Sequence, residues 1–213
     1  MDLVAITRGI AILGSAIGVL GLLVRLDEIM KRPFKQDLAR QRGDVRRGVL
    51  YAFTLGMAPW EKESTRRHWI AYLRGIVFHV GTFTAFGVLF VSPWLDRFPP
   101  LLIDLAAILC GLGGVAGFAG IPMRLSGENE RVLSLPDDYL SIFLVSLFTA
   151  LACVALLVRA WLPAFYLATA VMSVYIPFSK IRHCVYFFYS KFFFGAGFGY
   201  RGVIGQAPGK YNE

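Results

Sequence analysis

The chain has 213 residues, of which 56% are hydrophobic and 17% are charged, and its mean hydropathy is +0.59. A soluble domain carries charges at roughly a quarter of its positions, so this composition excludes an ordinary soluble globular domain. The net charge of +8 would suggest nucleic acid as the partner of a soluble protein. Here the basic residues lie between apolar runs, so we interpret the charge as membrane topology and expect no nucleic-acid partner.

Five stretches are long enough to cross a bilayer as helices, which takes about 20 apolar residues each. The first is longer than the apolar core of a signal peptide and follows an acidic start, so we predict that it is a retained helix. The sequence therefore predicts an all-α, multi-pass membrane domain over residues 1–213. The predicted spans are about 3–24, 70–94, 101–123, 138–157 and 162–190.

The segment 25–69 is the largest polar stretch, and we predict that it is a cytoplasmic loop. It contains a candidate amphipathic stretch, DLARQRGDVRRGVLYAF. One interpretation is a docking surface for a soluble partner. The other is a basic segment that lies on anionic lipid headgroups.

Glycines recur at helical spacing in two spans, as Gly14 with Gly18 and as Gly113 with Gly117. Such pairs allow close helix packing in lipid, although a helix thinned in this way could also admit a flat cofactor. Another glycine-rich stretch, GAGFGYRG, falls in the predicted cytoplasmic tail, 191–213. We interpret this stretch as a flexible exit from the membrane.

The basic residues predict the orientation of the chain. Nineteen of the 22 Lys and Arg residues fall on one side when five helices are threaded through a membrane, and Arg8, Arg97 and Arg159 fall on the other. Lys and Arg are retained on the cytoplasmic side. We therefore expect the N-terminus outside and the C-terminus in the cytoplasm, in a bacterial or archaeal cytoplasmic (inner) membrane.

Two of the three histidines lie in predicted spans, whereas His68 lies in a charged stretch before the second span. His79 is in the second span and His183 in the fifth, both in the predicted cytoplasmic half. Ionisable residues inside a span are costly and are candidates for function, and imidazole is a common axial ligand of heme iron. The pair therefore predicts a bis-histidine b heme, and the alternative is two isolated polar residues that bond to neighbouring helices.

Two basic residues and three cysteines are further candidates for a role in the site. Lys180 and Arg182 flank His183 and could neutralise the heme propionates, or they could simply reach the interface as the helix leaves the membrane. The three cysteines, Cys110, Cys153 and Cys184, are far apart and lack metal-binding spacing. We expect packed thiols there rather than a disulfide or a zinc site.

Three motifs resemble the cytochrome b (gamma) subunit family of respiratory nitrate reductase. They are VFHVGTFTAFG around His79, SLPDDYLSIFLVSLFTAL at the fourth span, and PFSKIRH ending in His183. The resemblance covers roughly residues 70–183 and implies that His79 and His183 ligate heme. It also extends to related subunits of heterodisulfide-reductase-like and sulfate-reducer transmembrane redox complexes, which work beside iron–sulfur proteins and multiheme cytochromes c.

The chain departs from that family at two positions where the family has further histidines, because Leu89 and Phe165 stand there. The resemblance therefore implies one retained heme, the one nearer the cytoplasm. The family's outer quinone site cannot be carried over. A single heme does not conduct electrons across a bilayer unaided, so the related redox complexes are a better analogy than nitrate reduction.

From these features we expect an electron-transfer subunit of an oxidoreductase complex rather than a stand-alone enzyme. One b heme would move electrons between membrane quinone (menaquinone or ubiquinone) and an iron–sulfur partner, with a multiheme cytochrome c or other membrane subunits as further partners. The first alternative is a heme-free membrane anchor of such a complex. The second is a small transporter or channel subunit, although the spans show few paired charges and no evident inverted repeat.

Overall fold

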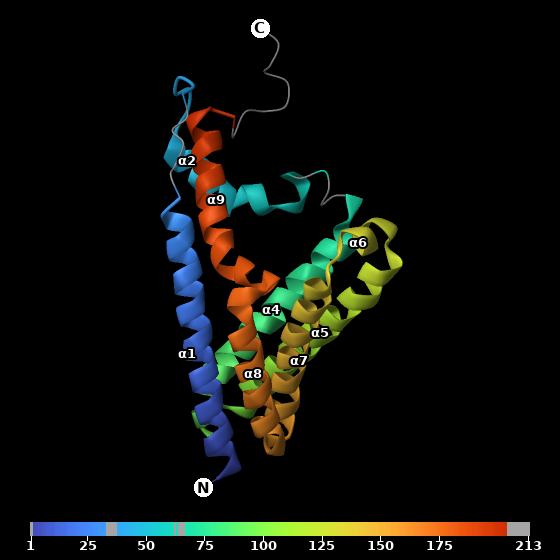
Figure 1. The fold of residues 1–213 in the computed structure, drawn as a ribbon. Coiled ribbons are helices and arrows are strands. Elements are labelled where there is room, and N and C mark those ends of the chain that lie inside the picture. Colours follow the sequence, from blue (N-terminus) through green and yellow to red (C-terminus); the bar gives the residue numbers. More distant parts are fainter. Residues whose placement is uncertain (1, 33–37, 62, 64–66, 204–213) are drawn as a thin grey trace. The chain divides into compact units, whose positions relative to one another are not determined.

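The computed structural model describes residues 2–32, 38–61, 63 and 67–203, and this part of the chain is helical and contains no strand. The predicted all-α class with five helices able to cross a membrane is confirmed. Short 3-10 segments extend α4 to Arg97 and flank α8 on both sides. The five helices are α1 (Leu3–Met30), α4 (Trp69–Val91), α5 (Pro100–Ser126), α7 (Pro136–Leu157) and α8 (Leu162–Tyr175) (Figure 1).

The chain divides into two compact units by the contacts within each, and the single membrane domain over 1–213 stays a prediction. The first unit comprises Met1–Leu23 and Ile70–Arg182, and the second comprises Val24–Trp69 and His183–Glu213. The predicted loop 25–69 and tail 191–213 therefore belong to the same unit. They do so because helices from both segments pack on each other.

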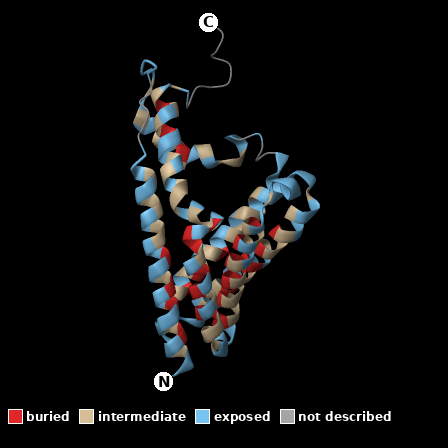
Figure 2. Ribbon diagram, in the orientation of Figure 1, coloured by how far each residue is buried: buried red, intermediate tan, exposed pale blue. Residues whose placement is uncertain are grey.

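Small residues bring the helices of the first unit close together. A Cβ added to Gly81 of α4 would lie 2.6 Å from the Cα of Gly113 in α5, and Gly14 of α1 is similarly close to Ala170 of α8. Lipid offers no hydrophobic drive between helices, so such close backbone packing stabilises the bundle. These contacts favour the packing interpretation of the repeated glycines, and the buried residues gather where the helices of this unit face each other (Figure 2).

The fifth predicted span, 162–190, is interrupted in the structure. Helix α8 ends at Tyr175, and α9 (His183–Tyr200) begins after two 3-10 turns, with Ser179 between them in an extended conformation (φ −107°, ψ 175°). Pro177 explains the break because it lacks a backbone N–H and its ring opposes a continuing helix. The Ser179 hydroxyl donates to the Ile176 carbonyl at 3.1 Å and accepts from the Ile181 N–H at 3.2 Å, which stabilises the turn.

The second unit is built on α9 and α2 (Val45–Phe53), which cross at glycines. A Cβ added to Gly195 would lie 2.7 Å from the Val49 Cα, and one added to Gly199 would lie 2.9 Å from the Gly48 Cα. The interpretation of GAGFGYRG as a flexible exit is therefore wrong, because its first six residues complete α9. In a helix these glycines permit the close approach of α2, which outweighs their weak helix propensity.

Replacing Gly195 with Ala is expected to loosen α2 from α9. The added methyl must displace backbone atoms of α2, and overpacking of this kind costs about 1–3 kcal/mol. Gly197 of the same helix is a matched control, because a Cβ there meets nothing within 4 Å. Hydrogen exchange of the α2 amides in detergent should accelerate in Gly195→Ala and stay unchanged or slow in Gly197→Ala. Equal exchange in the two variants would contradict the packing described here.

Candidate functional site

His79 lies in the membrane-spanning part of α4, on a face that is exposed. It is ten residues after Trp69, the first residue of the helix, which is about 15 Å along the axis. Its neighbours Ile76, Val80 and Phe83 are also exposed and apolar, whereas Gly81 faces α5. An ionisable ring on an apolar outer face is costly in hydrocarbon unless it is bound. This placement makes His79 a candidate ligand rather than a packing residue.

The imidazole of His79 is oriented by a hydrogen bond to its own helix. Its Nδ1 lies 2.7 Å from the carbonyl oxygen of Gly75. A carbonyl only accepts hydrogen bonds, so Nδ1 carries a proton, and in the neutral ring Nε2 then carries the lone pair. A histidine that ligates a metal is commonly held in this way, with the second nitrogen bonded to a carbonyl or carboxylate. His79 therefore has the tautomer required to bind iron through Nε2.

The other predicted site residues lie at the break after α8. Lys180 and Arg182 are in a 3-10 turn of the first unit, and His183, which is exposed, is the first residue of α9 in the second unit. His79 and His183 therefore belong to different units, whose relative positions are not determined. Ligation of one iron by both imidazoles stays a prediction.

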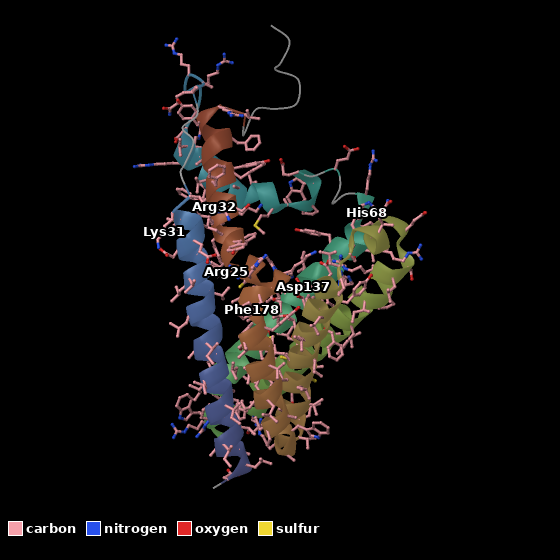
Figure 3. All side chains as sticks on the ribbon, in the orientation of Figure 1. Arg25, Lys31, Arg32, His68, Asp137 and Phe178 are labelled. Atoms are coloured by element: carbon pink, nitrogen blue, oxygen red, sulfur yellow. The ribbon has the colours of Figure 1, made fainter. Side chains whose placement is uncertain are left out.

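An acidic pair that the sequence reasoning did not select as a site holds this turn in the first unit. Asp137 is the second residue of α7 (labelled in Figure 3). Its carboxylate accepts from the Lys180 backbone N–H at 3.0 Å and from the Tyr175 hydroxyl at 2.5 Å. Asp138 forms an ion pair with the Lys180 ammonium at 2.6 Å and accepts from the Leu135 N–H at 2.8 Å. The pair thus joins the start of α7 to the segment that leads into His183.

The two partners of the ion pair differ in exposure. The Asp138 side chain is 9% exposed and that of Lys180 is 48% exposed. A nearly buried carboxylate requires such compensation, so Lys180 has a structural partner as well as its predicted place beside a propionate. The signal in the sequence is an acid pair directly after Pro136 at the start of a span, a position where acids favour the helix N-terminus.

The two positions where the related family has additional histidines lie against the packed apolar core of the first unit. Phe165 is fully buried and stacks on Phe148 with ring centroids 5.4 Å apart. Leu89 packs against the same cluster. Next to them, the buried Tyr166 hydroxyl donates to the Ser92 hydroxyl at 2.9 Å. Side chains of this bundle therefore fill the space around both positions.

Among the described residues, no group of three or more His, Cys, Asp and Glu side chains could hold a metal ion. The three cysteines form no disulfide, and Cys110 is buried. A b heme needs only two axial side chains, so His79 with His183 remains the candidate for iron.

The fold and these residues describe an all-helical protein with five helices able to cross a membrane and a histidine on the outer face of one of them. Comparison of the chain with protein-family models, curated proteins and solved structures finds no match in any of the three.

Replacing Asp138 with Asn is expected to destabilise the first unit, because the amide keeps the shape and loses the ion pair with Lys180. Loss of a hydrogen bond to a charged group costs about 1.5–3 kcal/mol, and the exposure of Lys180 favours the lower end. The thermal unfolding midpoint in detergent should fall, and high salt should reduce the difference from the wild type. Asp96→Asn, at an exposed position, is the control and should change the free energy of unfolding by less than about 0.5 kcal/mol.

Proposed function

We propose that the chain is a membrane cytochrome b subunit of a respiratory redox complex. It binds one b heme through His79 and His183, and it moves electrons between membrane quinone and a cytoplasmic iron–sulfur partner. Its N-terminus lies outside and its C-terminus in the cytoplasm of a bacterial or archaeal cytoplasmic membrane. The observation that carries the proposal is His79, a histidine within a span whose ring is oriented for ligation through Nε2.

The residues present are compatible with a b heme. When bound, the heme supplies reversible one-electron transfer. The Gly75 carbonyl fixes the tautomer and the ring of His79, and Phe78 and Phe83 lie beside that ring at centroid distances of 5.8 and 6.2 Å. Such an apolar surround limits water access and tunes the potential of a cofactor. Arg182 supplies positive charge next to His183 in the chain, which favours the anionic propionates, whereas the Lys180 ammonium is already paired with Asp138.

The second unit supports a partner on the cytoplasmic side. Exposed arginines precede and begin α2, including Arg40, Arg42, Arg46 and Arg47. By charge complementarity this surface suits an acidic redox protein, and such surfaces steer association. Anionic headgroups remain the alternative contact for the same residues. A multiheme cytochrome c would require a different surface, on the outer side of the membrane.

The experiment is a heme count on the purified chain or its complex. Dithionite-reduced minus oxidised spectra and pyridine hemochromogen stoichiometry should give one low-spin b heme per chain. His79→Ala and His183→Ala should each abolish it, because each removes an axial ligand. His68→Ala, which changes the histidine outside the spans, should retain it.

Other outcomes of the heme count decide against the proposal. Normal heme content in either His79→Ala or His183→Ala would remove that residue from the site. An intact preparation without heme would leave a membrane anchor, the second candidate. Two hemes that both depend on this chain would mean that a further ligand exists. In a complex with other cytochromes, the paired variants assign the heme to this subunit.

A further inference from the structure

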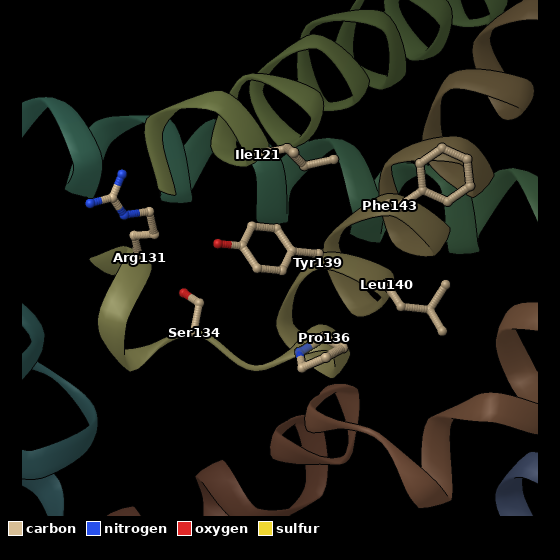
Figure 4. Close-up of a pocket in the computed structure, with 7 residues that line it drawn as sticks. All are labelled: Ile121, Arg131, Ser134, Pro136, Tyr139, Leu140 and Phe143. Atoms are coloured by element: carbon tan, nitrogen blue, oxygen red, sulfur yellow. The ribbon is translucent and has the colours of Figure 1, made fainter. Parts of the chain in front are cut away.

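An open cleft of about 680 Å³ lies on the first unit where α5, α6 (Glu128–Leu133) and α7 meet, away from the histidines that carry the proposed function. Figure 4 shows Arg131, Ser134 and the hydroxyl of Tyr139 toward one end and Ile121, Leu140 and Phe143 toward the other. The cleft is therefore amphipathic, with its polar and apolar parts separated. The cleft is wide open, so a ligand there would lie along the surface of the helices rather than inside the unit.

The polar and apolar ends are separated because their residues lie at different positions along the helix axes. Pro136 is the first residue of α7, and Phe143 lies seven residues further, about 10 Å along the axis. Ile121 lies a little more than one turn before the end of α5 at Ser126. Arg131 and Ser134 lie on or beside α6, in the connection outside both helices. The polar end therefore lies at the level of the helix ends, and the apolar end lies within the span.

The polar end carries a cationic side chain and two hydroxyl groups. Arg131 is exposed, and no ion pair found among the described residues uses it. Arg124 also reaches this end, because its Nη1 donates to the Ser134 hydroxyl at 3.0 Å, but the same Nη1 is paired with the Asp138 carboxylate at 4.0 Å, which leaves Arg131 as the main cation here. Guanidinium groups bind phosphate oxygens through charge-assisted hydrogen bonds. Glu128 and Glu130 on α6 lie in the same short helix. Their carboxylates oppose an anion, so binding there depends on direct contact with the guanidinium of Arg131.

We infer that this cleft is a binding site for one phospholipid, with its phosphodiester against Arg131 and Tyr139 and its acyl chain along Leu140 and Phe143. Leu140 and Phe143 are each 44% exposed, and in a bilayer the surface they form is covered by hydrocarbon. A quinone could pack on the apolar end of the cleft, but its uncharged ring would form no ion pair with Arg131. The inference is independent of heme binding and needs only that the helices lie in a membrane.

The test is native mass spectrometry of the full chain, delipidated in detergent and titrated separately with dioleoyl phosphatidylglycerol and dioleoyl phosphatidylethanolamine. One lipid of either headgroup should bind per chain at low concentration. Arg131→Gln should weaken that binding about tenfold, the scale of a lost charge-assisted hydrogen bond. Tyr139→Phe should weaken it less, and Arg97→Gln, an exposed arginine elsewhere in the unit, should leave it unchanged.

Each remaining outcome overturns the inference. Unchanged affinity in both Arg131→Gln and Tyr139→Phe would mean that the polar end binds nothing, and an equal loss in Arg97→Gln would mean a non-specific charge effect. Binding of water-soluble glycerophosphate as tightly as the lipid would exclude the apolar half. Displacement of the lipid by a quinone at equal concentration would make this a quinone site. Unfolding midpoints measured without lipid should match the wild type, which separates lost binding from lost folding.

Discussion

The constraint behind this structure is that hydrocarbon offers no hydrogen-bond partner to a peptide group. Every span must satisfy its own N–H and C=O groups, and a helix does so within one segment. The same constraint applies to the break between α8 and α9, where the backbone groups must find other partners. After Pro177 the backbone cannot continue its ladder, and the hydroxyl of Ser179 bonds the exposed groups of the turn instead. The chain leaves the first unit at this point, and His183 begins a new helix in the second.

Within this constraint, close packing replaces the hydrophobic effect as the source of helix association. Both units use glycine for it, at Gly81 with Gly113 in the first and at Gly48 with Gly199 in the second. The same residue type therefore joins membrane-spanning helices and joins the polar segment before α4 to the C-terminal helix. In the second unit α2 is packed closely on α9, and Arg46 and Arg47 of α2 are exposed.

Part of the fold and of the candidate site can be predicted from the sequence, and part cannot. The five spans were predicted close to their observed starts because apolar runs bounded by charge are a direct consequence of the bilayer. The break at Ser179 was not predicted, since Pro177 is as compatible with a kink as with an end. The glycines of α9 are typical of a loop when only the sequence is considered, because their close contact with α2 is visible only in the structure. The Asp138–Lys180 pair cannot be predicted for the same reason, since its members are 42 residues apart.

In the candidate site, the two histidines can be selected from the sequence alone. The hydrogen bond that orients His79 is visible only in the structure.

Polar groups in the spans of the first unit differ in where they lie, and the difference bears on function. Some bond to a neighbour within the unit: Tyr166 donates a hydrogen bond to Ser92, and Asp138 forms an ion pair with Lys180. Such groups stabilise a particular packing and need no ligand to explain them. His79 differs in its placement, because its Nδ1 bonds to its own helix and its ring lies on an exposed apolar face. A histidine that served only to join helices would be expected to point toward α5, where the facing positions are glycines. Its outward placement on an apolar helix face is the physical reason to consider a cofactor ligand first.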